Sequence, residues 1–207
     1  MQKHCSSRFF GSCVVAGMLF ALIMMVTLHL LRPDANPLRS FLSEYLVGPY
    51  GFLGTAATYV VAATFLMLLV GLRLSVHPSG FLTASCVLLG VMVICCCVCA
   101  VFPVDLMPPD GGRPTFTGAG ITHILASCVL YASLIAVSLT LPSAYKRDEK
   151  WRSFAHTTLF LGFLILASFA VLILVPFYLR GLVQRGMGLV ILAWLLLTGL
   201  RLRQAIQ

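Results

Sequence analysis

Five polar residues with chemically useful side chains stand beside or just inside long apolar segments of this chain. They are Ser43, Glu44, Asp105, His123 and Arg185. A histidine can act as a general base when a nearby carboxylate orients its ring. His123, Asp105 and Glu44 would also make an open ligand set for a divalent metal ion in a hydrolytic site. These three are therefore our candidate catalytic residues, with metal binding as one of two versions of the chemistry.

The segment at residues 37–51, PLRSFLSEYLVGPYG, surrounds Glu44 with further polar side chains. Our candidates for ligand binding are Ser43, Arg185, Arg39 and Tyr45. Ionisable groups at membrane depth are costly, so they face the protein interior or water and usually pair with one another. We expect Glu44 to lie within ion-pair reach of Arg185 or Arg39, with Asp105 as the alternative carboxylate.

The elements that position these residues follow from an apolar composition. The 207 residues are 60% hydrophobic and 10% charged, against about 25% charged in soluble domains. The net charge of +8 comes from basic residues that mostly flank apolar runs. Such flanking charge is typical of membrane topology, and no basic arm or aromatic-interleaved patch for nucleic acid is present. We expect membrane lipid as a partner and no nucleic acid.

Six apolar runs are each long enough to cross a bilayer as a helix, which takes about 20 residues. They cover approximately residues 12–31, 49–72, 80–102, 119–141, 153–177 and 186–202. The runs lack the alternation of a β-barrel, and the segments between them have ordinary loop lengths. The sequence predicts an all-α membrane fold, a six-transmembrane-helix bundle that forms one integral-membrane domain over residues 1–207. Within the first loop, LRSFLSEYL predicts a short interfacial helical turn.

The distribution of lysine and arginine predicts the orientation. One side would carry Lys3, Arg8, Arg73, Lys146, Arg147, Lys150, Arg152, Arg201 and Arg203. The other side would carry only Arg32, Arg39, Arg113, Arg180 and Arg185. The excess marks the cytoplasm. Both termini are then cytoplasmic, and the candidate site faces outward between helix ends.

Eight cysteines are present, and most lie inside the apolar runs. A disulfide framework needs cysteines in oxidising loops, so we do not expect one. The cluster CCCVC at residues 95–99 places adjacent thiols on different faces of a helix, which does not suit a metal site. We expect these cysteines to be small packing residues.

Several short motifs occur at helix ends in a consistent order. They are S-E-Y with G-P-Y-G at residues 43–51, F-P-x-D at residues 102–105, G-x-x-H at residues 120–123 and Q-R-G at residues 184–186. With these motifs the chain resembles, from about Ser12 to Arg203, the bacterial membrane family catalogued as domain of unknown function 998. The resemblance implies a six-span protein of the bacterial inner (plasma) membrane and no particular activity. Its motifs point to Ser43, Glu44, Asp105, His123 and Arg185.

Three functions remain open on the sequence alone. The first is an outer-facing polar pocket that binds or modifies a lipid or small amphiphile. The second is a non-catalytic sensor, transporter or partner subunit of a membrane complex whose protein partner is unknown. The third is haem binding by His29 and His123, which are both expected near the outer end of the bundle. The sequence names no substrate and does not decide whether the protein is an enzyme.

Overall fold

A computed structural model describes residues 2–106 and 115–204, with the backbone alone for residues 2–6. Within these ranges the chain is helical, without strands. The long helices are α1 (Gln2–Leu31), α2 (Gly51–Ser75), α3 (Gly80–Val101), α4 (Gly118–Tyr145), α5 (Ala155–Leu174) and α6 (Arg180–Gln204). Three short 3₁₀ turns are η1 (Leu42–Leu46), η2 (Arg152–Phe154) and η3 (Phe177–Leu179). All six long helices have the length and apolarity to cross a membrane, so the predicted fold class is confirmed.

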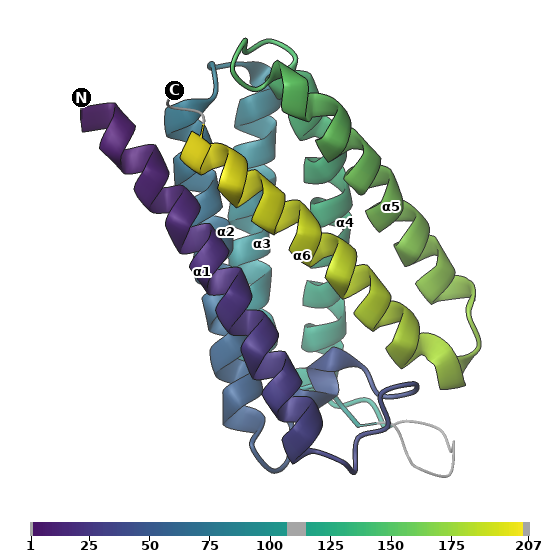
Figure 1. Cartoon of the computed structure of the whole chain (residues 1–207). Coiled ribbons are helices and arrows are strands. Elements are labelled where there is room, and N and C mark those ends of the chain that lie inside the picture. Colours follow the sequence, from purple (N-terminus) through teal and green to yellow (C-terminus); the bar gives the residue numbers. More distant parts are fainter. Residues whose placement is uncertain (1, 107–114, 205–207) are drawn as a thin grey trace.

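The six helices form a closed ring in which each packs on the next in sequence and α6 returns to α1. Figure 1 shows that α1 begins and α6 ends at the same end of the bundle. We call the opposite end, where η1 and η3 lie, the loop-one end. Turn η1 contacts both α2 and α6, so the first loop lies between these two helices at the loop-one end. Arg113, which we counted for the orientation, lies outside the described residues.

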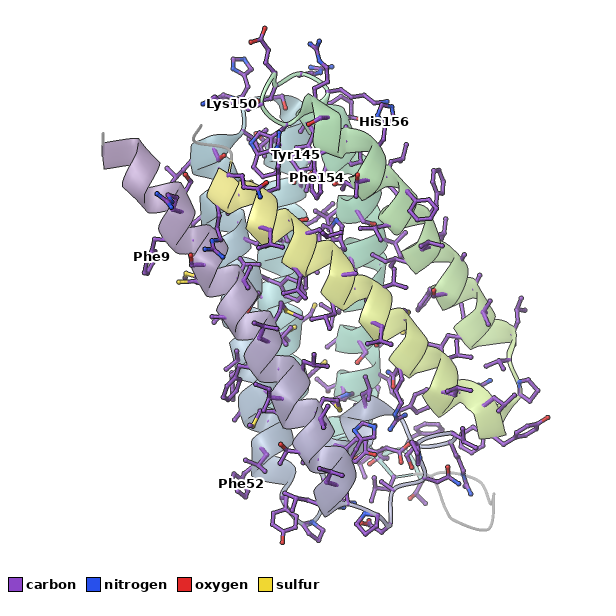
Figure 2. The ribbon with its side chains drawn as sticks, viewed as in Figure 1. Phe9, Phe52, Tyr145, Lys150, Phe154 and His156 are labelled. Atoms are coloured by element: carbon purple, nitrogen blue, oxygen red, sulfur yellow. The ribbon has the colours of Figure 1, made fainter. Side chains whose placement is uncertain are left out.

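The outer surface of the ring is apolar, as a lipid-facing surface must be. Phe9 and Phe52 point away from the helices in Figure 2, with 60% and 70% of their surface exposed. Leu30 and Leu174 are exposed still further. Apolar exposure of this extent has no place in water and matches the hydrocarbon of a bilayer. The protein is therefore a multi-pass membrane protein.

Two helix starts differ from the sequence prediction. Helix α1 begins at Gln2 instead of residue 12, and α6 begins at Arg180 instead of residue 186. We predicted a loop up to Arg185, and that prediction was wrong. The early start of α6 depends on a tertiary contact. The backbone N–H of Leu182 donates to the carbonyl of Leu38 at 3.1 Å, which gives a donor in the first turn of α6 its partner.

The cysteine cluster behaves as predicted. Cys95, Cys96 and Cys99 of α3 are buried among apolar side chains. Each is a free thiol. Their small size lets α3 pack closely on α4, which carries His123.

Candidate functional site

Loop one, residues 32–50, packs against α2 and α6 at the loop-one end. Glycines on these two helices allow its backbone to approach them closely. A Cβ on Gly54 of α2 would meet the carbonyl of Tyr45 at 2.9 Å. A Cβ on Gly181 of α6 would meet the carbonyl of Ser40 at 2.6 Å. Any larger residue at either position would push the loop away. The predicted helical turn is present as η1, and it is wedged between α2 and α6 with the Tyr45 side chain buried.

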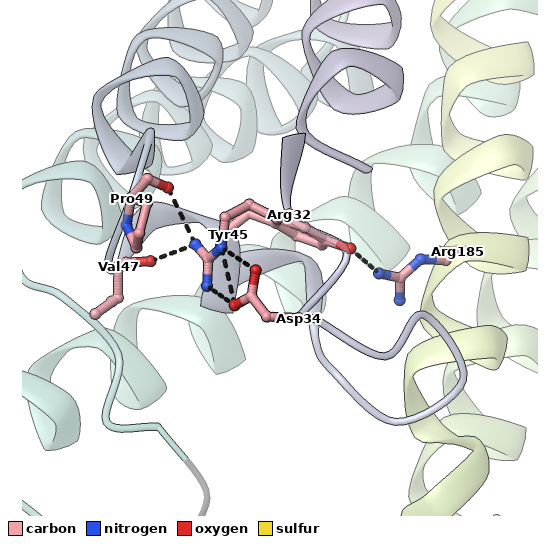
Figure 3. Close-up of polar contacts among 6 residues, drawn as sticks. All are labelled: Arg32, Asp34, Tyr45, Val47, Pro49 and Arg185. Atoms are coloured by element: carbon pink, nitrogen blue, oxygen red, sulfur yellow. Dashed lines mark hydrogen bonds and ion pairs between the residues drawn. The ribbon is translucent and has the colours of Figure 1, made fainter. Parts of the chain in front are cut away.

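Arg185 joins three parts of the chain that are far apart in sequence. Its Nε–H donates to Nε2 of His29 on α1 at 2.8 Å, and Nη1 donates to the carbonyl of Ser40 at 2.7 Å. Nη2 donates to the hydroxyl of Tyr45 at 3.2 Å, the bond drawn on the right of Figure 3. The flat guanidinium also lies over the Tyr45 ring. Arg185 is therefore a structural clamp on loop one.

The contacts of His29 fix its tautomer. Nδ1 lies 2.7 Å from the carbonyl of Met25, which can only accept, so Nδ1 carries the proton. Nε2 then accepts from Arg185 and carries none. The His29 ring also lies against the Tyr45 ring, with centroids 4.9 Å apart. With both nitrogens occupied, His29 does not suit the role of haem ligand that we considered for it.

A second arginine clamps the other side of loop one. Arg32 forms an ion pair with Asp34 at 2.8 Å and donates Nη1 to the carbonyls of Val47 and Pro49 (Figure 3). The hydrogen bond from Arg32 lowers the pKa of Asp34, and the same bond raises the pKa of Arg32. Among the described residues this is the ion pair that the structure shows.

Asp105 anchors the segment before α4. Its two carboxylate oxygens accept from the backbone N–H and the hydroxyl of Thr117, both at 2.8 Å. Thr117 in turn caps α4 by accepting from the N–H of Gly120 at 3.0 Å. The Asp105 carboxylate occupies the space where a side chain on Gly120 would stand. The G-x-x-H motif thus places Asp105 one helical turn from His123.

His123 is held by a backbone carbonyl and not by a carboxylate. Its Nδ1 lies 2.8 Å from the carbonyl oxygen of Phe102, so Nδ1 carries the proton and Nε2 offers a lone pair. The side chain is 97% buried, being only 3% exposed. Nε2 has no hydrogen-bond partner among the described residues. We predicted that Asp105 or Glu44 would orient the ring of His123, whereas in the structure the backbone carbonyl of Phe102 orients it.

A partly open cavity of about 510 Å³ has residues of all six helices in its wall. Most of the wall is apolar, including Met25, Val61, Leu130 and Phe169. Its polar lining includes Ser43, Glu44, Asp105 and His123. These four residues come from three parts of the sequence, and the structure places them around one space.

Gln184 is a site residue that we missed. Its Oε1 accepts from the backbone N–H of Leu42 at 2.7 Å, and its Nε2 donates to the hydroxyl of Tyr131 at 3.2 Å. It lines the cavity and links η1 to α4. The signal was available in the polar spacing of Arg180, Gln184 and Arg185, but we assigned these residues to a loop. On a helix, Gln184 follows Arg180 by one turn and can face inward with Gly181.

The other predicted site residues have separate partners. Arg185 does not pair with Glu44 or Asp105, because its donors are taken by His29, two carbonyls and Tyr45. Glu44 accepts at Oε1 from the N–H of Phe41 at 3.0 Å. Arg39 lies over the ring of Phe177. Across residues 2–106 and 115–204, no three histidine, cysteine or acidic side chains converge to hold a metal, so the expected ligand set does not form.

One comparison with known proteins gives a match. A family model described as a protein of unknown function (DUF998) matches residues 14–201. This range includes α2 to α5, most of α1 and α6, and all of the site residues named above. No curated protein and no solved structure matches the chain.

Proposed function

We propose that this chain, which belongs to the DUF998 family of proteins of unknown function, binds one single-chain amphiphile inside its helical ring. The alkyl tail lies in the apolar part of the cavity. The polar head lies among Ser43, Glu44, Asp105 and His123. The excess of basic residues on the side of the bundle that holds both termini supports a head group that faces the outer side of a bacterial inner membrane.

The observation that carries this proposal is the composition of the cavity wall along its depth. At the loop-one end the wall contains carboxylates and a histidine, while farther in it is lined by Val61, Leu130 and Phe169. A volume of 510 Å³ falls within the range of about 300–1,000 Å³ that small-molecule sites occupy. One alkyl chain with a small head fits this space.

Chemical modification of the bound molecule is a second version of the same proposal, and the tautomer of His123 favours it. A lone pair on Nε2 can take a proton from water or from a hydroxyl group of the ligand. The buried carbonyl of Phe102 keeps the ring in this tautomer. Release of a water-soluble fragment from a bound ester or amide would separate this version from binding alone.

The test is to fill the cavity and measure binding of three probes with the same tail: dodecanol, dodecylamine and dodecanoate. Ala57 of α2 lines the cavity and is 6% exposed, so Ala57→Leu places a larger side chain in the binding space. Ala63→Leu makes the same change on the exposed face of α2 and serves as the matched control. Native mass spectrometry of protein released from lipid nanodiscs counts the bound probe directly.

We expect at least one probe to bind to wild type and Ala63→Leu in one-to-one ratio, and Ala57→Leu to lose at least tenfold in affinity. Two results would contradict the proposal. One is that no probe binds above the background of empty nanodiscs. The other is that Ala57→Leu and Ala63→Leu bind the probe equally well.

A further inference from the structure

We infer that the head group bound in this cavity is a primary ammonium, so the ligand is a long-chain amine. This inference rests on the proposed function and names the chemical class that the same site takes. It is carried by two features of the described cavity wall. These are the sign of its charged groups and the orientation of its buried histidine.

Both charged residues in the described wall are acidic, namely Glu44 and Asp105. The arginines at the loop-one end have partners elsewhere. Arg185 donates to His29, Tyr45 and two carbonyls, Arg32 pairs with Asp34 and donates to two other carbonyls, and neither arginine lines the cavity. Arg32 is near enough for the charge of Glu44 to raise its pKa slightly, but Asp34 is its main partner. Arg39 and Arg180 lie over the ring of Phe177.

Two acceptor atoms in the wall have no donor among the described residues, and the hydroxyl of Ser43 can either donate or accept. Glu44 uses Oε1 to cap η1, and its Oε2 has no hydrogen-bond partner in the described part of the chain. The second acceptor is Nε2 of His123, on a side chain that is 97% buried. This side chain lines the cavity, so a ligand that brings an N–H to Nε2 gains a hydrogen bond there. The carboxylate of Asp105 lies beside Gly120, one turn of α4 before His123, and adds negative charge.

A primary ammonium meets these requirements together. It has three N–H donors and a positive charge, whereas a hydroxyl has a single donor and no charge. A carboxylate or phosphate head would bring a negative charge beside two others in a medium of low dielectric constant, where like charges repel strongly. A quaternary ammonium has the charge but no N–H to give to Nε2 of His123. The order of affinities for these head groups therefore tests the charge and the hydrogen-bond acceptors of the site.

The experiment measures the affinities of dodecylamine, dodecyltrimethylammonium, dodecanol and dodecanoate for the full chain in nanodiscs of zwitterionic lipid. Empty nanodiscs correct each value for partition into the bilayer. The first variant is Glu44→Gln, whose amide oxygen can still accept from the N–H of Phe41, so the cap of η1 is kept while the charge is removed. Glu149→Gln makes the same change at an exposed position at the other end of the bundle and is the matched control.

The second variant, His123→Asn, keeps a donor near the carbonyl of Phe102 and removes the acceptor at Nε2. We expect dodecylamine to bind at least tenfold more tightly than dodecanol and dodecyltrimethylammonium, and dodecanoate to bind most weakly. Glu44→Gln and His123→Asn should each weaken dodecylamine about tenfold while dodecanol changes little, and Glu149→Gln should match wild type.

Equal affinities for amine, alcohol and carboxylate, with binding still lost in Ala57→Leu, would overturn the ammonium inference and leave the amphiphile site intact. Tighter binding of dodecanoate than of dodecylamine would overturn it as well. Absence of binding for every probe would instead contradict the proposed function, so the two failures are distinct.

Discussion

The guanidinium of Arg185 donates to the ring of His29 across 2.8 Å, and this bond ties the sixth helix to the first. A neutral histidine is an uncommon partner for an arginine when carboxylates are close in sequence. Here the carbonyl of Met25 accepts a hydrogen bond from Nδ1–H on the far side of the ring, which leaves Nε2 as the acceptor. The same arginine also donates to the carbonyl of Ser40 and to the hydroxyl of Tyr45, so it links the first and sixth helices to loop one.

Replacing Arg185 by lysine should destabilise the protein although the charge is kept. An ammonium cannot reach His29, Ser40 and Tyr45 at once, because it lacks the planar fork of the guanidinium. The loss should be about 2 kcal/mol or more, which lowers the melting temperature by roughly 4–8 °C in a chain of this size. Thermal unfolding in nanodiscs measures it. Arg8→Lys on the exposed face of α1 is the control, and equal melting temperatures for the two variants would refute the clamp.

Two glycines of α4 should respond in opposite directions to alanine. In Gly120→Ala the new methyl group would collide with the carboxylate of Asp105 and break its bonds to Thr117. The expected cost is about 1–3 kcal/mol. Gly118 has open space around it, so Gly118→Ala should be neutral or stabilise the helix by up to about 1 kcal/mol. A destabilised Gly118→Ala together with a tolerated Gly120→Ala would contradict this placement of Asp105.

The ion pair of Arg32 and Asp34 predicts a dependence of stability on acid. The pKa of Asp34 is lower in the folded chain than its ordinary value because Arg32 donates a hydrogen bond to it. The stabilisation is therefore complete above about pH 4 and is lost as the pH falls through the lower folded pKa. We expect wild type to lose melting temperature below pH 4 more steeply than Asp34→Asn. Glu149→Gln should follow wild type, and parallel curves for all three proteins would count against the pair.

Gln184 should be as important to loop one as the charged residues. Gln184→Leu leaves the N–H of Leu42 and the hydroxyl of Tyr131 without their partner, which costs about 1–3 kcal/mol when the groups are buried. Gln204→Leu, an exposed change at the other end of α6, is the control. Limited proteolysis of loop one should be faster in Gln184→Leu alone. Identical cleavage rates in the two variants would show that the link is dispensable.

The sequence was sufficient for the fold because membrane helices are encoded by length and apolarity. All six spans were predicted, and the CCCVC segment was correctly assigned to packing. The start of α6 was wrong because Gln184 and Arg185 are polar, and their buried partners in loop one cannot be read from local sequence. The tertiary contact from Leu182 to Leu38 extends the helix against that local signal.

The candidate residues fall into two groups: four line one cavity, whereas Arg185, Arg39 and Tyr45 do not line it, and the predicted pairings do not form. Ser43, Glu44, Asp105 and His123 do line one cavity. We expected Arg185 to pair with an acidic side chain, whereas it uses backbone carbonyls, a tyrosine and a histidine. Backbone acceptors are present at every residue, so sequence alone cannot tell which of them a side chain will meet. The same limit applies to His123, whose ring is held by the carbonyl of Phe102.

The most direct test of the central claim is to map where the tail of a bound amphiphile lies. Dodecylamine with a photoactivatable diazirine near the end of its tail is bound in nanodiscs, illuminated, and its attachment sites are identified by peptide mass spectrometry. We predict attachment to the cavity wall at Leu130, Tyr131 and Phe169, and its loss in Ala57→Leu. Attachment spread over lipid-facing residues such as Ile94, Phe163 and Leu189, and unchanged in Ala57→Leu, would contradict the claim that the ring encloses a ligand.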